Sequence, residues 1–159
     1  MNLAAARERL AQVPDPEIPA VTLMDLGIVR ELRETDTGVE VVLTPTYSGC
    51  PATELIADDV RAALAGFGDV TVTLQRAPAW STDWISPAGR DKLQRYGIVP
   101  PQCQVGDGSG QAIRVVPKLR CPRCDGGKTE QLSRFGSTAC KSTWRCIECG
   151  EPFEYFKPI

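Results

Sequence analysis

Four cysteines in the last third of the chain are the residues whose spacing best predicts chemistry. They form two Cys-x-x-Cys pairs, CPRC at 121–124 and CIEC at 146–149, with 21 residues between the pairs. A Cys-x-x-Cys turn directs two thiolates toward one point, so two such turns can supply the four corners of a tetrahedral metal site. The sequence therefore predicts one metal ion held by Cys121, Cys124, Cys146 and Cys149.

The identity of the metal follows from the donor atoms. The chain contains no histidine, so we expect an all-sulfur site, and sulfur-only tetrahedra bind zinc or iron. Closed four-cysteine ribbons usually hold structural zinc, and this spacing is unlike that of common ferredoxin clusters. Zinc is therefore favoured, with iron as the alternative. The lack of histidine also removes the commonest general base and one member of most nucleophile triads.

Three further cysteines lie outside the two pairs. Cys50 precedes a predicted helix, whose N-terminal N–H groups would lower the pKa of its thiol. It is either a thiolate that binds or passes on metal, or a small side chain packed beneath a turn, and the residues alone favour neither. Cys140 could replace a metal ligand, serve as an exposed transfer thiol or be a buried bystander, which we favour. Cys103 is expected to be incidental.

Acidic and hydroxyl side chains before Cys50 are the other candidates. Asp25 precedes a Leu-Gly turn at the entry to a strand, so it could face the Cys50 turn. Asp15 and Glu17 are interpreted instead as capping and solvated groups of a proline-rich loop. Hydroxyl groups are present nearby on Thr44, Thr46 and Ser48. No metallohydrolase motif and no glycine-rich phosphate loop occurs in the sequence.

The elements that position these residues can be predicted from periodicity and end signals. Helices are expected over 2–12, 51–65 and 87–96, and strands over 28–32, 38–46 and 69–75. The short polar segment 35–38 predicts an antiparallel hairpin, and Ser86 and Gly97 are expected to begin and end the last helix. Trp80 and Trp84 are interpreted as core or loop anchors. The resulting α-β-β-α-β-α order predicts a small α+β sandwich with helices over one sheet.

Composition divides the chain in two. Residues 1–97 are predicted to form the first domain. Residues 98–118, with three prolines and GDGSG, are predicted to be a linker. Residues 119–159 are predicted to form a metal ribbon, and because so short a segment cannot build a large core, the metal should provide much of its stability.

Charge and hydropathy narrow the classes of partner. The net charge of −2 gives no reason to expect nucleic acid or membrane as a partner. Residues 118–159 carry eight basic and five acidic side chains, which we interpret as a balance for a dianionic tetrathiolate centre rather than as a contact surface. No signal peptide and no apolar run of about 18 residues is present, so a cytoplasmic location with reduced thiols is expected.

Two blocks of sequence resemble a known family, in the family's own order. DPEIPAVTLMDLGIVREL and TPTYSGCPA resemble the MIP18-type domain, also called DUF59, a family that includes iron–sulfur cluster assembly and targeting factors. STDWISPAGRDKLQRYGIVPP, followed by CPRC, GSTACKSTWRC and CGEPFEYFK, resembles the D-type (also named J) subunits of bacterial phenylacetyl-CoA epoxidase systems. The resemblance covers nearly the whole chain. KSTWRC departs modestly from the expected pattern without removing a ligand.

The resemblance implies a fold, partners and a role. It implies a MIP18-like sandwich followed by a zinc ribbon with a structural zinc ion, and it matches Asp25, Thr46 and Cys50 to the polar positions of a functional pocket. Systems of this family epoxidise the aromatic ring of phenylacetyl-CoA in aerobic phenylacetate degradation, with a di-iron oxygenase and a reductase that carries flavin and a ferredoxin-type cluster. The D-type subunit is implied to be a non-catalytic maturation factor that helps iron or a transiently held iron–sulfur cluster enter one of these partners.

Two other functions stay open at this point. A structural subunit of the oxygenase complex would co-purify with the oxygenase in fixed proportion, whereas a maturation factor would associate transiently. Direct enzymatic or redox work through Cys50 or Cys140 would require turnover by the isolated chain, and the absence of histidine and of any cofactor-binding loop argues against it.

Overall fold

The computed structural model describes residues 2–47, 49–102 and 117–159. Contacts divide the chain into two compact units, unit 1 (residues 1–92) and unit 2 (residues 93–159), and each is described by itself. Within the described part of the chain, no helix is both long and apolar enough to cross a membrane. The thiol of Cys103 and the hydroxyl of Ser48, both named as candidates from the sequence, lie outside the described residues.

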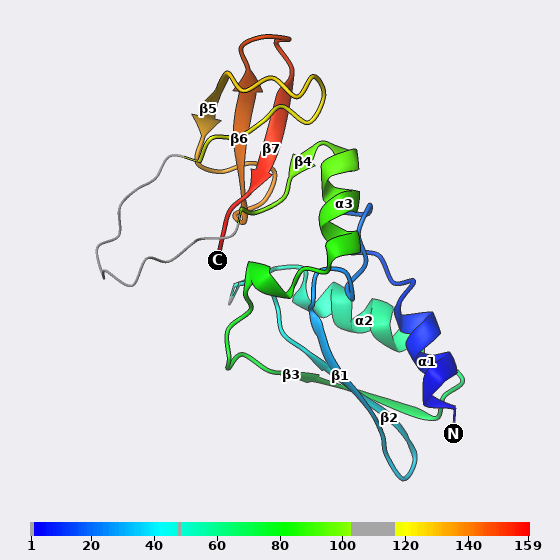
Figure 1. Ribbon diagram of the computed structural model, residues 1–159. Coiled ribbons are helices and arrows are strands. Elements are labelled where there is room, and N and C mark those ends of the chain that lie inside the picture. Colours follow the sequence, from blue (N-terminus) through cyan, green and yellow to red (C-terminus); the bar gives the residue numbers. More distant parts are fainter. Residues whose placement is uncertain (1, 48, 103–116) are drawn as a thin grey trace, which may run out of the picture. The chain divides into compact units, whose positions relative to one another are not determined.

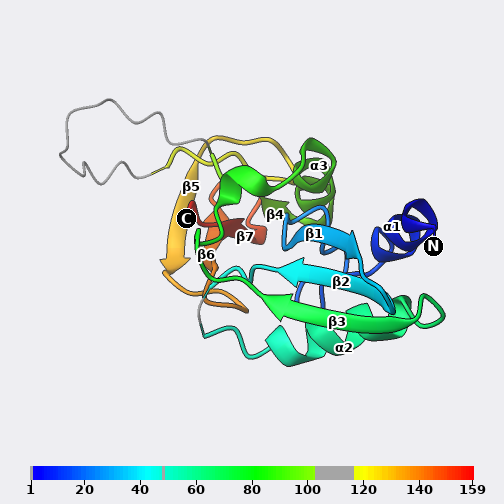
Figure 2. The same ribbon diagram turned by 90° about the horizontal axis from the view of Figure 1, so that it is seen from below.

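Unit 1 has the predicted order of helices and strands. Its elements are α1 (Leu3–Leu10), β1 (Val29–Glu34), β2 (Gly38–Leu43), α2 (Thr53–Ala63), β3 (Asp69–Leu74), the short 3-10 helix η1 (Thr82–Trp84) and the larger part of α3 (Pro87–Tyr96). β1 and β2 form the predicted antiparallel hairpin, and β3 pairs with β2 in parallel. Figure 2 shows the strands side by side in the order β1, β2, β3, so β2 is the central strand.

The core of unit 1 lies between this sheet and helices α1 and α2, which cover the same face of it (Figure 1). The buried residues of these elements include Ala6, Leu10, Val39, Val41, Leu43, Ile56 and Val60. They recur every second residue on the strand and every fourth on the helices, so one face of each element is apolar. The predicted small α+β fold is confirmed.

The last helix of unit 1 follows its predicted end signals. The Ser86 hydroxyl oxygen accepts a hydrogen bond of 2.9 Å from the Gly89 N–H, as an N-cap does. Gly97, just beyond the last helical residue, has a φ of +94°, which favours glycine. Trp80 is buried and its indole N–H donates to the Leu26 carbonyl at 2.8 Å, so it is the core anchor that the sequence predicts.

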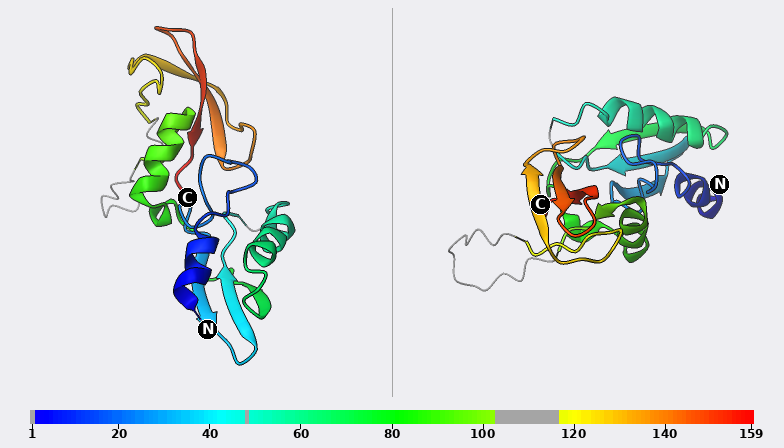
Figure 3. Two further views of the ribbon diagram at one scale, coloured as in Figure 1. Left: turned by 90° about the vertical axis from the view of Figure 1, so that its right-hand side faces the viewer. Right: turned by 90° about the horizontal axis from the view of Figure 1, so that it is seen from above.

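Unit 2 is a four-stranded sheet that follows the end of α3. Its strands are β4 (Ile98–Val99), β5 (Thr129–Ser133), β6 (Lys141–Cys146) and β7 (Pro152–Phe156). They lie in the order β4-β7-β6-β5; β5, β6 and β7 are antiparallel neighbours, and β4 runs parallel to β7. β5 is an outer strand of this sheet (Figure 3). The β6–β7 turn and the β5–β6 loop lie at opposite ends of the sheet (Figure 1).

The boundary between the two parts differs from the prediction. We expected the first domain to end at residue 97 and a linker to cover 98–118, but the units divide after Lys92. Ile98 and Val99 form β4, which pairs with Glu154 and Tyr155 of β7. The prolines that follow indicated irregular structure. Pairing with a strand from the far end of the chain depends on tertiary packing and leaves no local signal.

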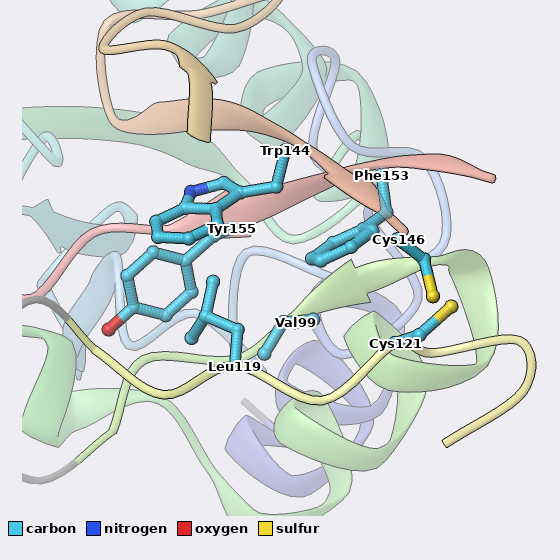
Figure 4. Close-up of a cluster of buried hydrophobic side chains, with 7 residues drawn as sticks. All are labelled: Val99, Leu119, Cys121, Trp144, Cys146, Phe153 and Tyr155. Carbon is cyan, nitrogen blue, oxygen red and sulfur yellow. The ribbon is translucent and has the colours of Figure 1, made fainter. Parts of the chain in front are cut away.

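A cluster of seven buried residues forms the core of unit 2 (Figure 4): Val99, Leu119, Cys121, Trp144, Cys146, Phe153 and Tyr155. The rings of Trp144 and Tyr155 meet edge to face, with 6.4 Å between centroids and 87° between planes. Two members are predicted metal ligands, Cys121 and Cys146, whose sulfur atoms point toward one another (Figure 4). Because the core and the metal site share residues, a bound metal would stabilise this small core directly.

Candidate functional site

The four cysteines of the two pairs converge at one end of unit 2. Their Sγ atoms all lie within 4.8 Å of one another. The Sγ–Sγ distance is 3.7 Å between Cys121 and Cys149 and 3.6 Å between Cys124 and Cys146. Four Zn–S bonds of about 2.3 Å in a tetrahedron require Sγ–Sγ distances of about 3.8 Å. The donor set therefore fits a tetrahedral metal centre.

The same backbone turn holds each pair. In the first pair the Asp125 N–H donates to the Cys121 carbonyl at 2.9 Å, and Asp125 has a φ of +59°. In the second, the Gly150 N–H donates to the Cys146 carbonyl at 2.9 Å, and Gly150 has a φ of +78°. This left-handed residue, four positions after the first cysteine, turns the chain so that both thiols face one point. Aspartate is one of the few other residues that tolerate this conformation.

Backbone N–H groups surround the sulfur atoms. Those of Arg123 and Gly126 donate to the two sulfurs of the first pair, each at 3.4 Å. The Gly126 N–H lowers the pKa of Cys124, but bonds to the other thiols and burial raise it to about 12. In the second pair, hydrogen bonds from the N–H groups of Cys149 and Glu148 lower the pKa of Cys146 to about 7. Such donors stabilise a thiolate, which is the form of cysteine that binds metal.

Cys140 lies away from this centre. It directly precedes β6, whose other end carries Cys146, and six residues of strand span roughly 20 Å. The side chain is buried, and its Sγ lies 2.9 Å from the Thr138 hydroxyl oxygen. The structure therefore excludes Cys140 as a replacement ligand of the centre and agrees with the buried position that we favoured.

Cys50 lies in unit 1, in the loop that connects β2 to α2. Its carbonyl accepts hydrogen bonds from the N–H and the hydroxyl of Thr53, at 3.3 and 2.8 Å. These bonds form a separate turn, so α2 begins at Thr53 and not at Pro51, where the sequence predicted its start. The thiol is half-buried and accepts a hydrogen bond from the Ala52 N–H.

The charges around Cys50 reverse the effect that the sequence predicted for its thiol. Burial raises the pKa of Cys50 and the Ala52 N–H lowers it, while the carboxylates of Glu17 and Asp15 raise it further. The resulting pKa lies above the ordinary cysteine value. The predicted lowering by a helix N-terminus is wrong, because burial and two negative charges outweigh the N–H groups of the turn.

Asp15 and Glu17, interpreted from the sequence as loop groups, are therefore electrostatic neighbours of Cys50. Asp15 does cap its loop: its Oδ1 accepts hydrogen bonds from the N–H groups of Glu17 and Ile18, at 3.0 and 2.8 Å. The cap fixes the loop that carries these two carboxylates, whose charges raise the pKa of the Cys50 thiol. The sequence signal that could have identified them is an acidic pair among prolines in the segment PDPEIP. Prolines restrict the backbone, so acidic side chains between them are held in fixed positions.

Asp25 is held in unit 1 by Lys92 of α3 and by Thr22. Its Oδ2 accepts hydrogen bonds from the Lys92 ammonium at 2.6 Å and from the Thr22 N–H at 3.0 Å, and its Oδ1 lies 3.4 Å from the Ser86 hydroxyl. Burial raises the pKa of Asp25, but hydrogen bonds from Lys92 and Thr22 outweigh burial and hold the pKa below its ordinary value. These contacts join Asp25 to α3, and its position facing the Cys50 turn stays a prediction.

Two threonines lie between β2 and Cys50. Thr46 is half-buried in the loop. The hydroxyl of Thr44 is buried and has no hydrogen-bond partner among the residues that the structure describes. A buried hydroxyl without a partner costs stability. The Thr44 hydroxyl could therefore form a favourable hydrogen bond with a ligand or a water molecule at the start of this loop.

Two family models together match most of the chain. The model described as "Iron-sulfur cluster assembly protein" matches residues 3–74, and the "PaaD zinc beta ribbon domain" matches residues 105–157. The first match contains the Cys50 loop, and the second contains the four-cysteine centre. The two candidate sites therefore belong to different family domains.

Individual relatives match either most of the chain or little more than half of it. The chain is 49% identical to a protein of Escherichia coli (strain K12) named as the putative D-type subunit of 1,2-phenylacetyl-CoA epoxidase, over 94% of this chain and 89% of that protein. It is 35% identical to the "Fe-S protein maturation auxiliary factor YitW" of Bacillus subtilis (strain 168), over 57% of this chain and 83% of that protein. Among solved structures, a domain of unknown function DUF59 from Bacillus anthracis matches with a TM-score of 0.52 and 26% identity, over 55% of this chain and 87% of that chain.

Proposed function

The chain belongs to the family of D-type subunits of 1,2-phenylacetyl-CoA epoxidase, in which an iron–sulfur cluster assembly domain precedes a zinc ribbon, and on this premise we propose that it is an accessory maturation factor of the phenylacetyl-CoA epoxidase system. In this proposal the chain has no oxygenase activity of its own. It helps iron or an iron–sulfur cluster enter the reductase or the di-iron oxygenase, in the cytoplasm, where thiols stay reduced.

Maturation is assigned to the first part of the chain. The maturation factor from Bacillus subtilis matches over 83% of its own length but only 57% of this chain, which leaves too little of it for a ribbon. The assembly family model matches residues 3–74, so the shared part is the first one. Cys50 is the one cysteine in the sequence before residue 103. A thiol that serves maturation in this shared part is therefore Cys50.

The observation that carries the proposal is the grouping of Cys50 with the carboxylates of Asp15 and Glu17. These negative charges disfavour a free thiolate but favour a cation at the same place, and metal binding displaces the thiol proton. Iron is here the cargo and not a resident cofactor. In this proposal the one sulfur and the neighbouring carboxylates hold the cargo briefly and pass it on to the partner.

The raised pKa of Cys50 also supports an accessory role over a catalytic one. A thiol that stays protonated at neutral pH is a poor nucleophile, and the sequence contains no histidine that could remove its proton. Metal transfer does not need a free thiolate in the resting protein, because the incoming cation itself drives deprotonation.

The ribbon is assigned a structural zinc ion. All four positions of its donor set are cysteine sulfurs, which leaves no open position for a substrate or water, and closed four-thiolate sites of this kind are structural. The zinc ion would hold the two turns together and complete the core that contains Cys121 and Cys146.

The proposal is tested in a strain that lacks this chain but contains the rest of the epoxidase system. We expect Cys50→Ser to keep the zinc content and the thermal unfolding of the wild type, while the reductase and oxygenase purified from that strain contain several-fold less iron. Glu8→Gln, a substitution at an exposed position of α1, should support full iron loading. Full iron loading and epoxidase activity with Cys50→Ser would show that this role is wrong.

A structural subunit of the oxygenase complex is the second candidate, because the Escherichia coli relative is named as a subunit. The two functions differ once the partner has been loaded with metal. A maturation factor can be removed from the loaded oxygenase without loss of activity. Removal of a structural subunit abolishes activity, and such a subunit co-purifies in fixed proportion.

A further inference from the structure

The loop between β5 and β6, residues 134–140, presents an aromatic side chain to solvent. The Phe135 side chain is 63% exposed. We call this segment the Phe135 loop. A single exposed apolar residue is common and needs no explanation by itself. The unusual feature of Phe135 is the number of interactions that hold the loop around it.

Interactions on both sides fix the position of the phenylalanine. The Lys157 ammonium lies 4.6 Å from the centroid of the Phe135 ring and donates a hydrogen bond of 3.0 Å to the Arg134 carbonyl. The Phe135 N–H donates to the Ser133 hydroxyl oxygen at 3.2 Å. The Gly136 N–H donates to the carbonyl of Lys141 at 2.8 Å and closes the loop.

An ion pair between the buried Lys141 and the part-buried Glu154 holds the Phe135 loop in place. The Lys141 side chain is 2% exposed, and its ammonium lies 3.0 Å from the Glu154 carboxylate. That carboxylate also accepts hydrogen bonds from the N–H and the hydroxyl of Ser137, at 2.6 and 3.2 Å. Burial of charged groups is costly unless they are fully paired. The Lys141–Glu154 pair holds the Phe135 loop in place while the Phe135 side chain stays exposed to solvent. The pair therefore orders the loop without burying the phenylalanine.

A rigid exposed aromatic residue has the properties of an interface anchor. Phenylalanine brings a large apolar area, and a loop that is already ordered loses little entropy on binding. The Lys157 ammonium lies against the Phe135 ring, and the residue before Phe135, Arg134, is also basic and exposed. The nearby Glu154 carboxylate is paired with Lys141, so the loop presents mainly positive charge. A partner surface that complements this loop has an apolar pocket with carboxylates at its rim.

We propose that the Phe135 loop docks this chain on the component of the epoxidase system that it serves, with Phe135 in an apolar pocket and Arg134 and Lys157 against carboxylates at the rim. This inference rests on the proposed function. The maturation factor from Bacillus subtilis, matched over 83% of its length, has too little length left for a ribbon. An anchor on the ribbon therefore explains how a general maturation domain selects one system.

The test places a photo-crosslinking residue in the full-length chain, inside cells that contain all the epoxidase components. One variant is Phe135→p-benzoylphenylalanine, which keeps an aromatic side chain. The matched control is Ile147→p-benzoylphenylalanine, since Ile147 is 59% exposed in the same unit but lies in the β6–β7 turn, at the other end of the sheet. Crosslinked products are identified by mass spectrometry.

We expect the variant at position 135, and not the one at 147, to crosslink to the reductase or an oxygenase subunit, at a segment that contains carboxylates. Phe135→Ala should then weaken binding of that purified component by about 30-fold or more, as loss of a hot spot does, and Ile147→Ala by less than about 3-fold. Equal crosslinking from both positions, no crosslink to any epoxidase component, or unchanged binding by Phe135→Ala would overturn the inference.

The two proposals fail in different ways. Cys50→Ser should crosslink normally through position 135 and yet leave the reductase and oxygenase with several-fold less iron. Normal iron loading by Phe135→Ala, with zinc content unchanged, would overturn docking through this loop and leave the role of Cys50 intact. Crosslinking to an epoxidase component combined with full iron loading by Cys50→Ser would retain the docking loop and overturn maturation through Cys50.

Discussion

Replacement of Asp25 by alanine should destabilise unit 1 by about 1.5–3 kcal/mol. The carboxylate accepts a hydrogen bond of 3.0 Å from the Thr22 N–H, which contributes about 1–2 kcal/mol in a part-buried site. The Lys92 ion pair at 2.6 Å contributes about 0.5–1 kcal/mol, because the lysine is 44% exposed and water screens the pair. The 3.4 Å contact with Ser86 is too long to add much.

This prediction can be measured by native-state hydrogen exchange on peptides from β2 and α2. A loss of about 1.5–3 kcal/mol corresponds to a decrease of about 13- to 150-fold in the protection of the slowest amides. The graded control is Lys92→Met, which removes the ion pair but leaves the Thr22 bond, and should reduce protection by only about 2- to 5-fold.

The same variant has a defined pH dependence. The pKa of Asp25 is lower in the folded state than its ordinary value, so its contribution is fully present above about pH 5 and is lost as the pH falls through the folded pKa. The difference in stability between the wild type and Asp25→Ala should therefore decrease below about pH 4.

The opposite result would support the functional pocket to which family resemblance assigns Asp25. If Asp25→Ala keeps the exchange protection of the wild type, the anchoring role derived from Lys92 and Thr22 is wrong. If it also delivers less iron to the epoxidase components, Asp25 acts at the site of maturation.

Three further results are expected. Removal of the metal by a chelator should abolish exchange protection in β6 and β7 while leaving β2 and α2 unchanged; equal loss in both units would contradict a metal that stabilises the ribbon core. Glu154→Gln should destabilise unit 2 by about 3 kcal/mol because it leaves Lys141 buried without its partner, and Lys141→Met should cost clearly less; urea unfolding distinguishes the two, and equal costs would count against the pair. Glu17→Gln should lower the pKa of Cys50, so alkylation of Cys50 at pH 8 should be faster than in the wild type, with Glu8→Gln unchanged; an unaltered rate would separate Glu17 from the thiol.

Much of the local structure could be predicted because its causes are local. The Cys-x-x-Cys spacing predicts two thiol-bearing turns, and the structure closes each turn with a left-handed residue at the same position, Asp125 or Gly150. Ser86 and Gly97 begin and end α3 through contacts within a few residues. The β1–β2 hairpin depends on a short polar connection between two β-rich runs. The family resemblance rests on the same short blocks and is confirmed by the comparisons.

Contacts between distant residues decided the candidate sites. The pairing of Asp25 with Lys92, and of Cys50 with the charges of Asp15 and Glu17, joins segments that no periodic pattern connects. Side-chain partners across a fold are selected by packing, and a sequence offers several carboxylates for each such place. The expected low pKa of the Cys50 thiol failed for this reason.

The sequence by itself determined that this chain contains a four-thiol metal ribbon after a small α+β domain, because ligand spacing and amphipathic periods are properties of short segments. Only the tertiary structure decided which charges surround Cys50, that Cys140 lies at the far end of β6 from the metal centre, and that Ile98–Val99 completes the second sheet. These features depend on burial and on distances between remote segments, which are set when the apolar faces pack together and not by any single stretch of residues.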